Sequence, residues 1–139
     1  MRHERAWANK TAWKLYKENW QLCKDIVAER DGKKCILCGT KSDLQLDHCI
    51  TRSRKSVFFE TQLLNYLCSR CHSSKSFQNG GPTDKIVDLK TMRRIGKPEY
   101  EDLIAKSQEL CPQFRRVWYQ EEMNEYLKEQ LEYWKVRTE

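Results

Sequence analysis

The sequence predicts an α+β fold, in which a small β-hairpin and a short helix are flanked by N-terminal and C-terminal helices. Helical periodicity predicts the flanking helices, because apolar side chains recur every three or four residues near both ends of the chain. Alternating apolar and polar residues in the middle predict a strand. The third observation is two pairs of closely spaced cysteines, which bracket the predicted hairpin and would tie it to the short helix.

The first 81 residues contain the elements of the predicted core. A helix from about Glu4 to Arg30 has a broad apolar face, and Asp31-Gly32 ends it. The alternating residues Leu44–Ile50 predict a half-buried strand, and Val57–Phe59 predicts a short second strand or the approach to one. A short helix from Cys71 to about Phe77 precedes a glycine-rich break at residues 79–82.

Residues 82–139 are predicted to form a helical extension packed on the core formed by residues 1–81. A first helix runs to Arg94, and Pro98 starts a second one with acidic residues in its first turn. A long final helix follows Pro112 and extends to about Val136. The short segment at residues 79–82 is the predicted boundary between the two parts.

Composition predicts a soluble protein with an uneven distribution of charge. The formal net charge of the 139 residues is +6, with positive charge concentrated before residue 98 and an acidic tail after it. No apolar run approaches the ~20 residues of a membrane helix, and the first residues lack the apolar stretch of an export signal. We therefore expect a cytoplasmic protein without a membrane partner, whose basic part faces a polyanion.

Four of the seven cysteines predict a structural zinc site. Cys35 and Cys38 form one C-x-x-C pair, and Cys68 and Cys71 form another; 29 residues separate the two pairs. Two such pairs supply the four thiolates of a closed tetrahedral zinc site, and a small core benefits from that staple. The other three cysteines are expected to be small buried hydrophobes: Cys23, Cys49 and Cys111.

Two of the three histidines lie between or beside these cysteines, together with a carboxylate. Phosphodiester hydrolysis needs a divalent cation and a base that activates water. Asp47 and His72 offer a carboxylate oxygen and an imidazole as ligands, and His48 remains as the candidate base. Each residue alone also has a mundane interpretation, as a surface polar group or a neighbour of the zinc site. Their combination inside one hairpin and helix favours a catalytic site.

The same residues resemble the HNH endonuclease family, and the resemblance covers residues 30–75: Arg30-Asp31-Gly32, Cys35-x-x-Cys38-Gly39, Leu46-Asp47-His48 and Leu67-Cys68-x-x-Cys71-His72-x-x-Lys75. It implies a ββα-metal core, with His48 as general base and with Asp47 and His72 as ligands of Mg²⁺ or Mn²⁺. Bacteriophage NinG-type recombination proteins are similar more loosely, through these positions: His48-x-x-x-Arg52, Phe59-Glu60, Cys68-x-x-Cys71 and Arg94-Ile95-Gly96. A phage-encoded protein would act in the host cytoplasm.

The sequence departs from the HNH pattern at the central asparagine. In most family members this residue lies five positions before the third cysteine, where this chain has Leu63. Asn65, three positions before Cys68, is the candidate for the role, which is to brace the hairpin loop. A regular strand would also point Asp47 and His48 to opposite faces, so we expect the strand to end or bulge there.

The resulting interpretation is a metal-dependent DNA endonuclease that cleaves or nicks DNA. Five basic side chains are expected to contact phosphates near the cut: Arg52, Arg54, Lys55, Arg70 and Lys75. One alternative is a catalytically inactive zinc-knuckle protein that binds nucleic acid. The other is a protein-interaction module whose acidic C-terminal helix binds a partner, for example in a phage-type packaging or recombination complex.

Overall fold

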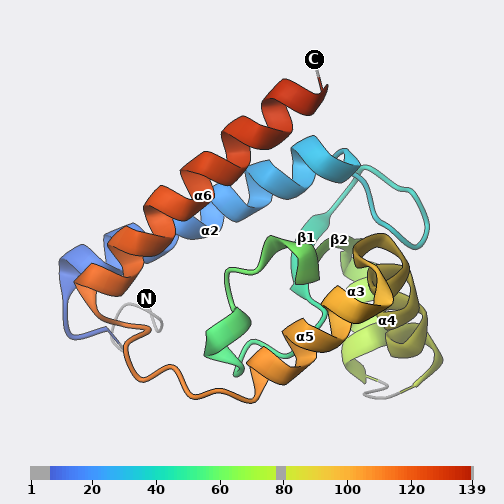
Figure 1. Ribbon diagram of the computed structural model, residues 1–139. Helices are drawn as coiled ribbons and strands as arrows, with labels where there is room; N and C mark the ends of the chain where they lie inside the picture. The colour runs from blue at the N-terminus through green and yellow to red at the C-terminus, as the bar shows by residue number, and fades with distance from the viewer. Residues whose placement is uncertain (1–6, 78–80, 139) are drawn as a thin grey trace.

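The computed structural model describes residues 7–77 and 81–138, and it confirms the predicted α+β fold. Two long helices, α2 (Lys10–Asp31) and α6 (Val117–Thr138), lie side by side, as Figure 1 shows. The two-stranded sheet and the shorter helices lie on one side of this pair (Figure 1). None of the described helices is both long and apolar enough to cross a membrane.

Helix α2 begins later than the sequence predicted. Asn9 caps it, because its side-chain oxygen accepts hydrogen bonds from the backbone N–H groups of Thr11 and Ala12 at 2.9 and 3.1 Å. The predicted residues 4–6 lie outside the described residues. The predicted end is confirmed: Gly32, at φ 78°, donates its N–H to the Ala28 carbonyl and closes the helix.

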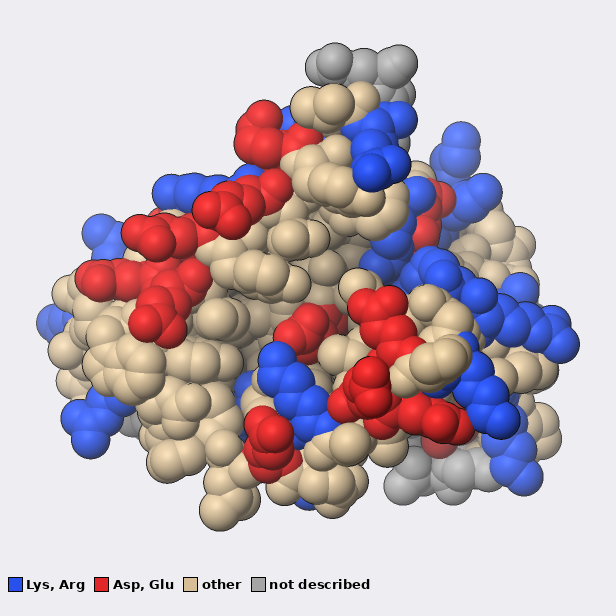
Figure 2. Space-filling view, viewed as in Figure 1, with Lys and Arg blue, Asp and Glu red and all other residues tan. Residues whose placement is uncertain are grey.

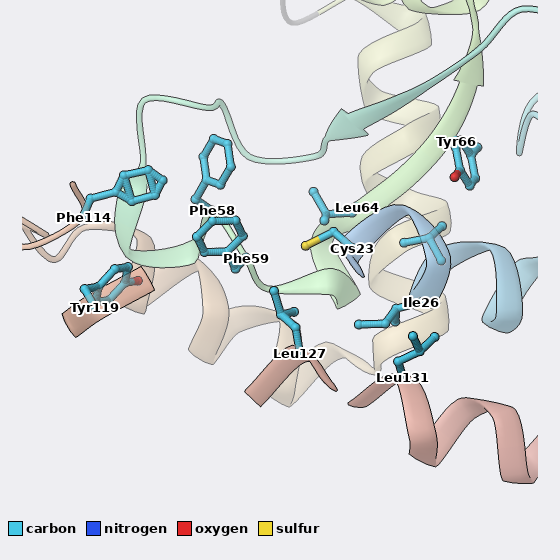
Figure 3. Packing of buried hydrophobic residues seen from close by; sticks show 11 residues of the cluster. Cys23, Ile26, Phe58, Phe59, Leu64, Tyr66, Phe114, Tyr119, Leu127 and Leu131 are labelled. Carbon is cyan, nitrogen blue, oxygen red and sulfur yellow. The ribbon is translucent and has the colours of Figure 1, made fainter. Parts of the chain in front are cut away.

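The main hydrophobic core lies between the α2–α6 pair and the hairpin. Figure 3 shows Cys23 and Ile26 of α2 facing Leu127 and Leu131 of α6, beside aromatic rings from the hairpin loop. The core residues are less than one-tenth exposed, and burial of this apolar area stabilises the fold. The C-terminal helix is therefore packed on the core, although the predicted division after residue 81 stays a prediction.

A polar network crosses the same helix pair. Asn19 of α2, which is completely buried, donates from Nδ2 to the backbone oxygen and to Oε1 of Gln120, both at 2.9 Å. Its Oδ1 accepts a hydrogen bond from Asn124 Nδ2 at 2.9 Å. Every buried amide in this network thus has a partner, as buried polar groups require.

The hairpin consists of β1 (Leu44–His48) and β2 (Leu64–Cys68), which pair antiparallel with Leu44 opposite Cys68 and His48 opposite Leu64. The first strand was predicted correctly, but Val57–Phe59 does not form the second one. That segment is compact, because Val57 and Phe58 donate their N–H groups to carbonyls only three residues earlier. Two 3₁₀ turns, η1 (Lys55–Val57) and η2 (Thr61–Leu63), fill the connection between the strands.

Three helices cover the other side of the hairpin and complete the fold. Helix α3 (Ser69–Phe77) continues directly from β2, two residues earlier than predicted. Helices α4 (Pro82–Ile95) and α5 (Lys97–Ser107) are separated by Gly96 at φ 99°, where the sequence predicted a break. Helix α3 contacts both strands and α4, so the residues of its first turns are held against the hairpin.

Candidate functional site

The four predicted zinc cysteines form one cluster, and their Sγ atoms all lie within 4.8 Å of one another. Cys35 and Cys38 lie in the turn after α2, whereas Cys68 ends β2 and Cys71 lies in the first turn of α3. Thiolates at ~2.3 Å from a tetrahedral zinc ion lie about 3.8 Å apart. The Sγ atoms of Cys38 and Cys68 are 3.6 Å apart, so the cluster fits that ion.

The local backbone prepares the cysteine turn for a metal. Gly39, at φ 77°, donates its N–H to the Cys35 carbonyl at 2.9 Å and reverses the chain. The Ile36 N–H donates to the Tyr66 carbonyl, which ties the turn to β2. Burial raises the pKa of Cys35, but hydrogen bonds from surrounding backbone N–H groups outweigh it and bring the pKa to about 6. Burial and the neighbouring thiols raise the pKa of Cys71 to about 12, so a metal must displace protons from the cluster to bind the thiolates.

None of the seven cysteines forms a disulfide, so the four clustered thiols are available to bind a metal. Cys23 is a completely buried core residue, as predicted. Cys49 is only half-buried, and its thiol donates a hydrogen bond to Asp88 Oδ1 at 3.1 Å. Cys111 is half-buried as well.

Asp47 lies at the centre of a second polar group, on the hairpin face that α3 covers. Its Oδ1 is 3.3 Å from Nε2 of His72, and its Oδ2 is 3.3 Å from Nζ of Lys75. Lys75 Nζ also lies 3.5 Å from Asp84 Oδ1 of α4. Burial raises the pKa of Asp47, whereas the nearby Lys75 and His72 act to lower it. Asp47 Oδ2 is buried and accepts no hydrogen bond from the described residues, so the ammonium ion is its charge partner.

His48 is fixed by contacts on the other face of the hairpin. Its ring stacks on Trp20 of α2, with centroids 5.0 Å apart and planes 10° from parallel. Its Nε2 lies 3.2 Å from the Phe58 carbonyl, and a carbonyl can only accept, so Nε2 carries the proton. In the neutral ring Nδ1 is then unprotonated and able to accept a proton. Burial lowers the pKa of His48 to about 4, with lesser contributions from nearby cations.

Strand β1 ends at His48, as predicted, and the two neighbouring side chains border one cavity despite their opposite directions. The cavity has a volume of about 680 Å³. Asp47, His48, His72 and Lys75 line it from the hairpin and α3. Its opposite wall belongs to α2 and includes Trp20, Lys24 and Asp25, while Thr51 and Arg52 lie at the loop side.

Four predicted site residues do not line this cavity. Arg54 and Arg70 are exposed side chains outside it, and Lys55 borders a different, smaller cavity. Asn65 is completely buried and turns toward α4. Its Nδ2 donates to Thr91 Oγ1 at 3.0 Å, and its Oδ1 accepts from Arg94 at 2.6 Å.

Reasoning from the sequence missed Trp20 and Lys24 as residues of the site. Trp20 was assigned to the core because it lies beside the apolar stripe of its helix. Its contact with His48 joins residues 28 positions apart in the sequence, and no local pattern reports such a contact. Arg94 entered only through the looser phage resemblance, yet it braces β2 through Asn65 and the Gln62 carbonyl.

The fold and the cysteine cluster define this chain as an α+β metal-binding module with a four-cysteine site. The donor set suits structural zinc, because four thiolates leave no open position for a substrate. No protein-family model, curated protein or solved structure that was compared with the chain matches it. A function beyond metal binding therefore rests on the site itself.

Proposed function

We propose that this protein is a metal-dependent DNA endonuclease of the HNH kind, with the 680 Å³ cavity as its active site. The observation that carries the proposal is the position of three side chains around this cavity. The Asp47 carboxylate and the His72 imidazole are in contact, and the fixed ring of His48 borders the same space. The proposal agrees with the resemblance of residues 30–75 to HNH endonucleases.

The Asp47–His72 pair fits a divalent cation. Neighbouring ligands of an octahedral ion with bonds of ~2.1 Å lie about 3 Å apart. Oδ1 of Asp47 and Nε2 of His72 are 3.3 Å apart, close to that spacing. Oδ2 faces the Lys75 ammonium at 3.3 Å, so Oδ1 is the oxygen that would bind the ion. A bound Mg²⁺ or Mn²⁺ ion would neutralise charge on the scissile phosphate and on the leaving oxygen.

His48 is suited to remove a proton from the attacking water. The Phe58 carbonyl selects the tautomer with an unprotonated Nδ1, and stacking on Trp20 holds the ring in one orientation. Such a fixed tautomer suits a general base, and general-base catalysis contributes about 10²–10⁴-fold in rate. The pKa of about 4 keeps the ring unprotonated at neutral pH but makes it a weaker base than a free imidazole. His48 itself is not a metal ligand in this proposal.

The cations around the cavity are suited to hold the DNA backbone. Arg52, Lys24 and Lys75 line it, and their charges would position phosphates without reading the base sequence. Asn65 would act through the scaffold, because its hydrogen bonds tie β2 to α4 directly opposite Asp47 in the hairpin.

Nicking of supercoiled plasmid tests this proposal. The zinc-loaded protein should convert supercoiled to relaxed or linear DNA when Mg²⁺ or Mn²⁺ is added, and His48→Ala should not. Wild-type protein that binds DNA but never nicks it, with either metal, would refute the enzyme.

A catalytically inactive DNA-binding protein is the second candidate, and one observation favours it. Lys75 already neutralises Asp47 and is shared with Asp84, so the carboxylate has a cation without any metal. Under this alternative Lys75→Met lowers the stability of the fold and leaves no metal-dependent activity to lose. Under the endonuclease proposal the same substitution raises the affinity for Mn²⁺, because it removes a competing charge.

A partner of helix α6 stays a prediction. Figure 2 shows Asp and Glu gathered over the region where α6 lies, and Trp118 and Tyr133 of this helix are about half exposed. The mass of the protein in solution without DNA tests self-association through this surface, and a monomer would exclude it.

A further inference from the structure

A second, smaller cavity lies beside the candidate active site and is made by three separate parts of the chain. The first part is the start of the described chain, with Trp7 just before α2 and with Trp13 and Tyr16 in its first turns. The second is the loop after β1, with Arg52 and Lys55, and the third is the segment before α6, with Phe114 and Arg115. Arg52 lines both this cavity and the larger one. We call the smaller one the cationic pocket.

Aromatic rings support the cations of this pocket. Lys55 Nζ lies 4.7 Å from the ring centre of Phe58 and 5.1 Å from that of Phe114. The guanidinium of Arg115 lies 5.6 Å from the ring centre of Trp7. Such contacts hold a cation over a ring face. Figure 3 shows Phe58 and Phe114 at the edge of the hydrophobic cluster, so these rings are anchored in the core.

The charges of the pocket have one sign. Arg52, Lys55 and Arg115 line it, and no Asp or Glu is among its described lining residues. Burial lowers the pKa of Lys55, and repulsion from Arg52 and Arg115 lowers it further. The fold thus places three cations around one small cavity, where a bound anion would contact several of them at once.

The size of the pocket limits what the anion is. Its volume is about 80 Å³, which leaves room for a small anion. A single phosphate group is of this size, whereas a nucleobase is larger. Arginine and lysine are also the side chains that proteins use most to contact phosphate.

We propose that the cationic pocket binds a backbone phosphate of a nucleic-acid strand that continues from the large cavity past Arg52. The inference rests on the proposed function, because it needs nucleic acid in the large cavity. It adds Arg115 to the binding surface, so the segment before α6 takes part in holding the substrate. The DNA surface then spans all three parts of the chain that form the pocket.

Salt-dependent DNA binding tests the inference without any cleavage. Fluorescence anisotropy measures the binding of a labelled DNA duplex to wild type, Arg115→Gln and Lys55→Gln, without Mg²⁺ or Mn²⁺. The salt concentration is varied between about 50 and 200 mM, the range over which phosphate contacts are lost. Each substitution should lower the slope of log affinity against log salt by ~0.9, the value for one phosphate contact with duplex DNA. Arg116→Gln is the matched control, because the neighbouring Arg116 is exposed like Arg115 but does not line the pocket. Its slope should equal that of wild type.

Each outcome separates this inference from the proposed nuclease activity. Wild-type nicking together with an unchanged slope for Arg115→Gln overturns the pocket and leaves the enzyme. A lowered slope for Arg115→Gln, unlike Arg116→Gln, in a protein that never nicks DNA supports the pocket and overturns the enzyme. Titration calorimetry with inorganic phosphate tests whether the pocket binds free phosphate instead of a DNA backbone phosphate. If wild type binds inorganic phosphate saturably and Arg115→Gln does not, while the salt slope for DNA is unchanged, the pocket is a free-phosphate site. That result overturns the nucleic-acid proposal. A wild type that binds no DNA overturns it too.

Discussion

Replacing His48 with alanine tests the proposed catalytic role most directly, because the structure predicts two separable effects. The first effect is on stability. The substitution removes a ring stacked on Trp20, worth about 0.5–1.5 kcal/mol, and leaves the Phe58 carbonyl without its donor at about 1–3 kcal/mol. We therefore expect the free energy of unfolding to fall by about 2–4 kcal/mol.

The second effect is on turnover. Loss of a general base lowers the rate by about 10²–10⁴-fold, which corresponds to about 2.7–5.4 kcal/mol in the activation barrier. The remaining rate should rise with pH, because hydroxide replaces the missing base. Added imidazole should restore part of the rate, because the substitution leaves a ring-sized space against Trp20.

The assay is single-turnover nicking of plasmid at a temperature where circular dichroism shows the variant to be folded. Phe59→Leu is the matched control, because Phe59 is a buried ring of the main hydrophobic core but does not line the large cavity. It should lose stability and keep its turnover. If His48→Ala nicks at the wild-type rate, or if Phe59→Leu loses as much activity, the role assigned to His48 is wrong.

Three further predictions concern the metal sites and the helix pair. Asp47→Ala should first weaken the affinity for Mg²⁺ or Mn²⁺, so that cleavage needs more metal and is partly restored at high metal concentration; a loss that no metal concentration alters would argue against a ligand role. Cys68→Ser should release zinc, which a chromogenic chelator measures, and should unfold the hairpin, because structural zinc contributes about 10–16 kcal/mol to folding. Retained zinc and an unchanged circular dichroism spectrum would contradict the four-cysteine site. Asn19→Ala should lower the free energy of unfolding, measured by urea titration, by about 2–4 kcal/mol, because it leaves buried groups of Gln120 and Asn124 without hydrogen-bond partners. A decrease below ~1 kcal/mol would show that water replaces the hydrogen bonds of Asn19.

The parts of the fold that the sequence predicted are those encoded over short distances. Cys35, Cys38, Cys68 and Cys71 form a cluster as predicted, because the spacing within each pair already provides the turn that binds a metal. The strand Leu44–His48 was found because its apolar residues alternate over consecutive positions. Gly32 and Gly96 ended helices where predicted, because their positive φ angles are a local property of the chain.

The errors arose where tertiary contacts decide between similar local patterns. Val57–Phe59 and Leu64–Cys68 are both short apolar runs, and a run of this kind does not distinguish a strand from a buried turn. The pairing with β1 selects the second run. The aromatic rings Phe58 and Phe59 instead fill the core between the hairpin and the α2–α6 pair.

The sequence predicted the reactive residues of the candidate site but not the residues from other elements that pack around them. Asp47, His48 and His72 border one cavity, and their residue types already favoured that grouping. Trp20 reaches His48 only because α2 crosses the hairpin, and Asn65 turns to Thr91 and Arg94 because α4 packs there. The roles of all these residues stay predictions until activity is measured.

The hydrogen-bonded side-chain amides between α2 and α6 also protect the chain against domain swapping of α6. The apolar contacts of Leu127 and Leu131 would tolerate a shift of α6 by one turn, but the bonds joining Asn19 to Gln120 and Asn124 would not. These amides thus select one alignment, as a buried asparagine does in paired helices. A variant with leucine at all three positions should gain hydrophobic stability and lose that selection. Its C-terminal helix would then be free to dock on a neighbouring copy, and domain-swapped dimers should accumulate at high protein concentration.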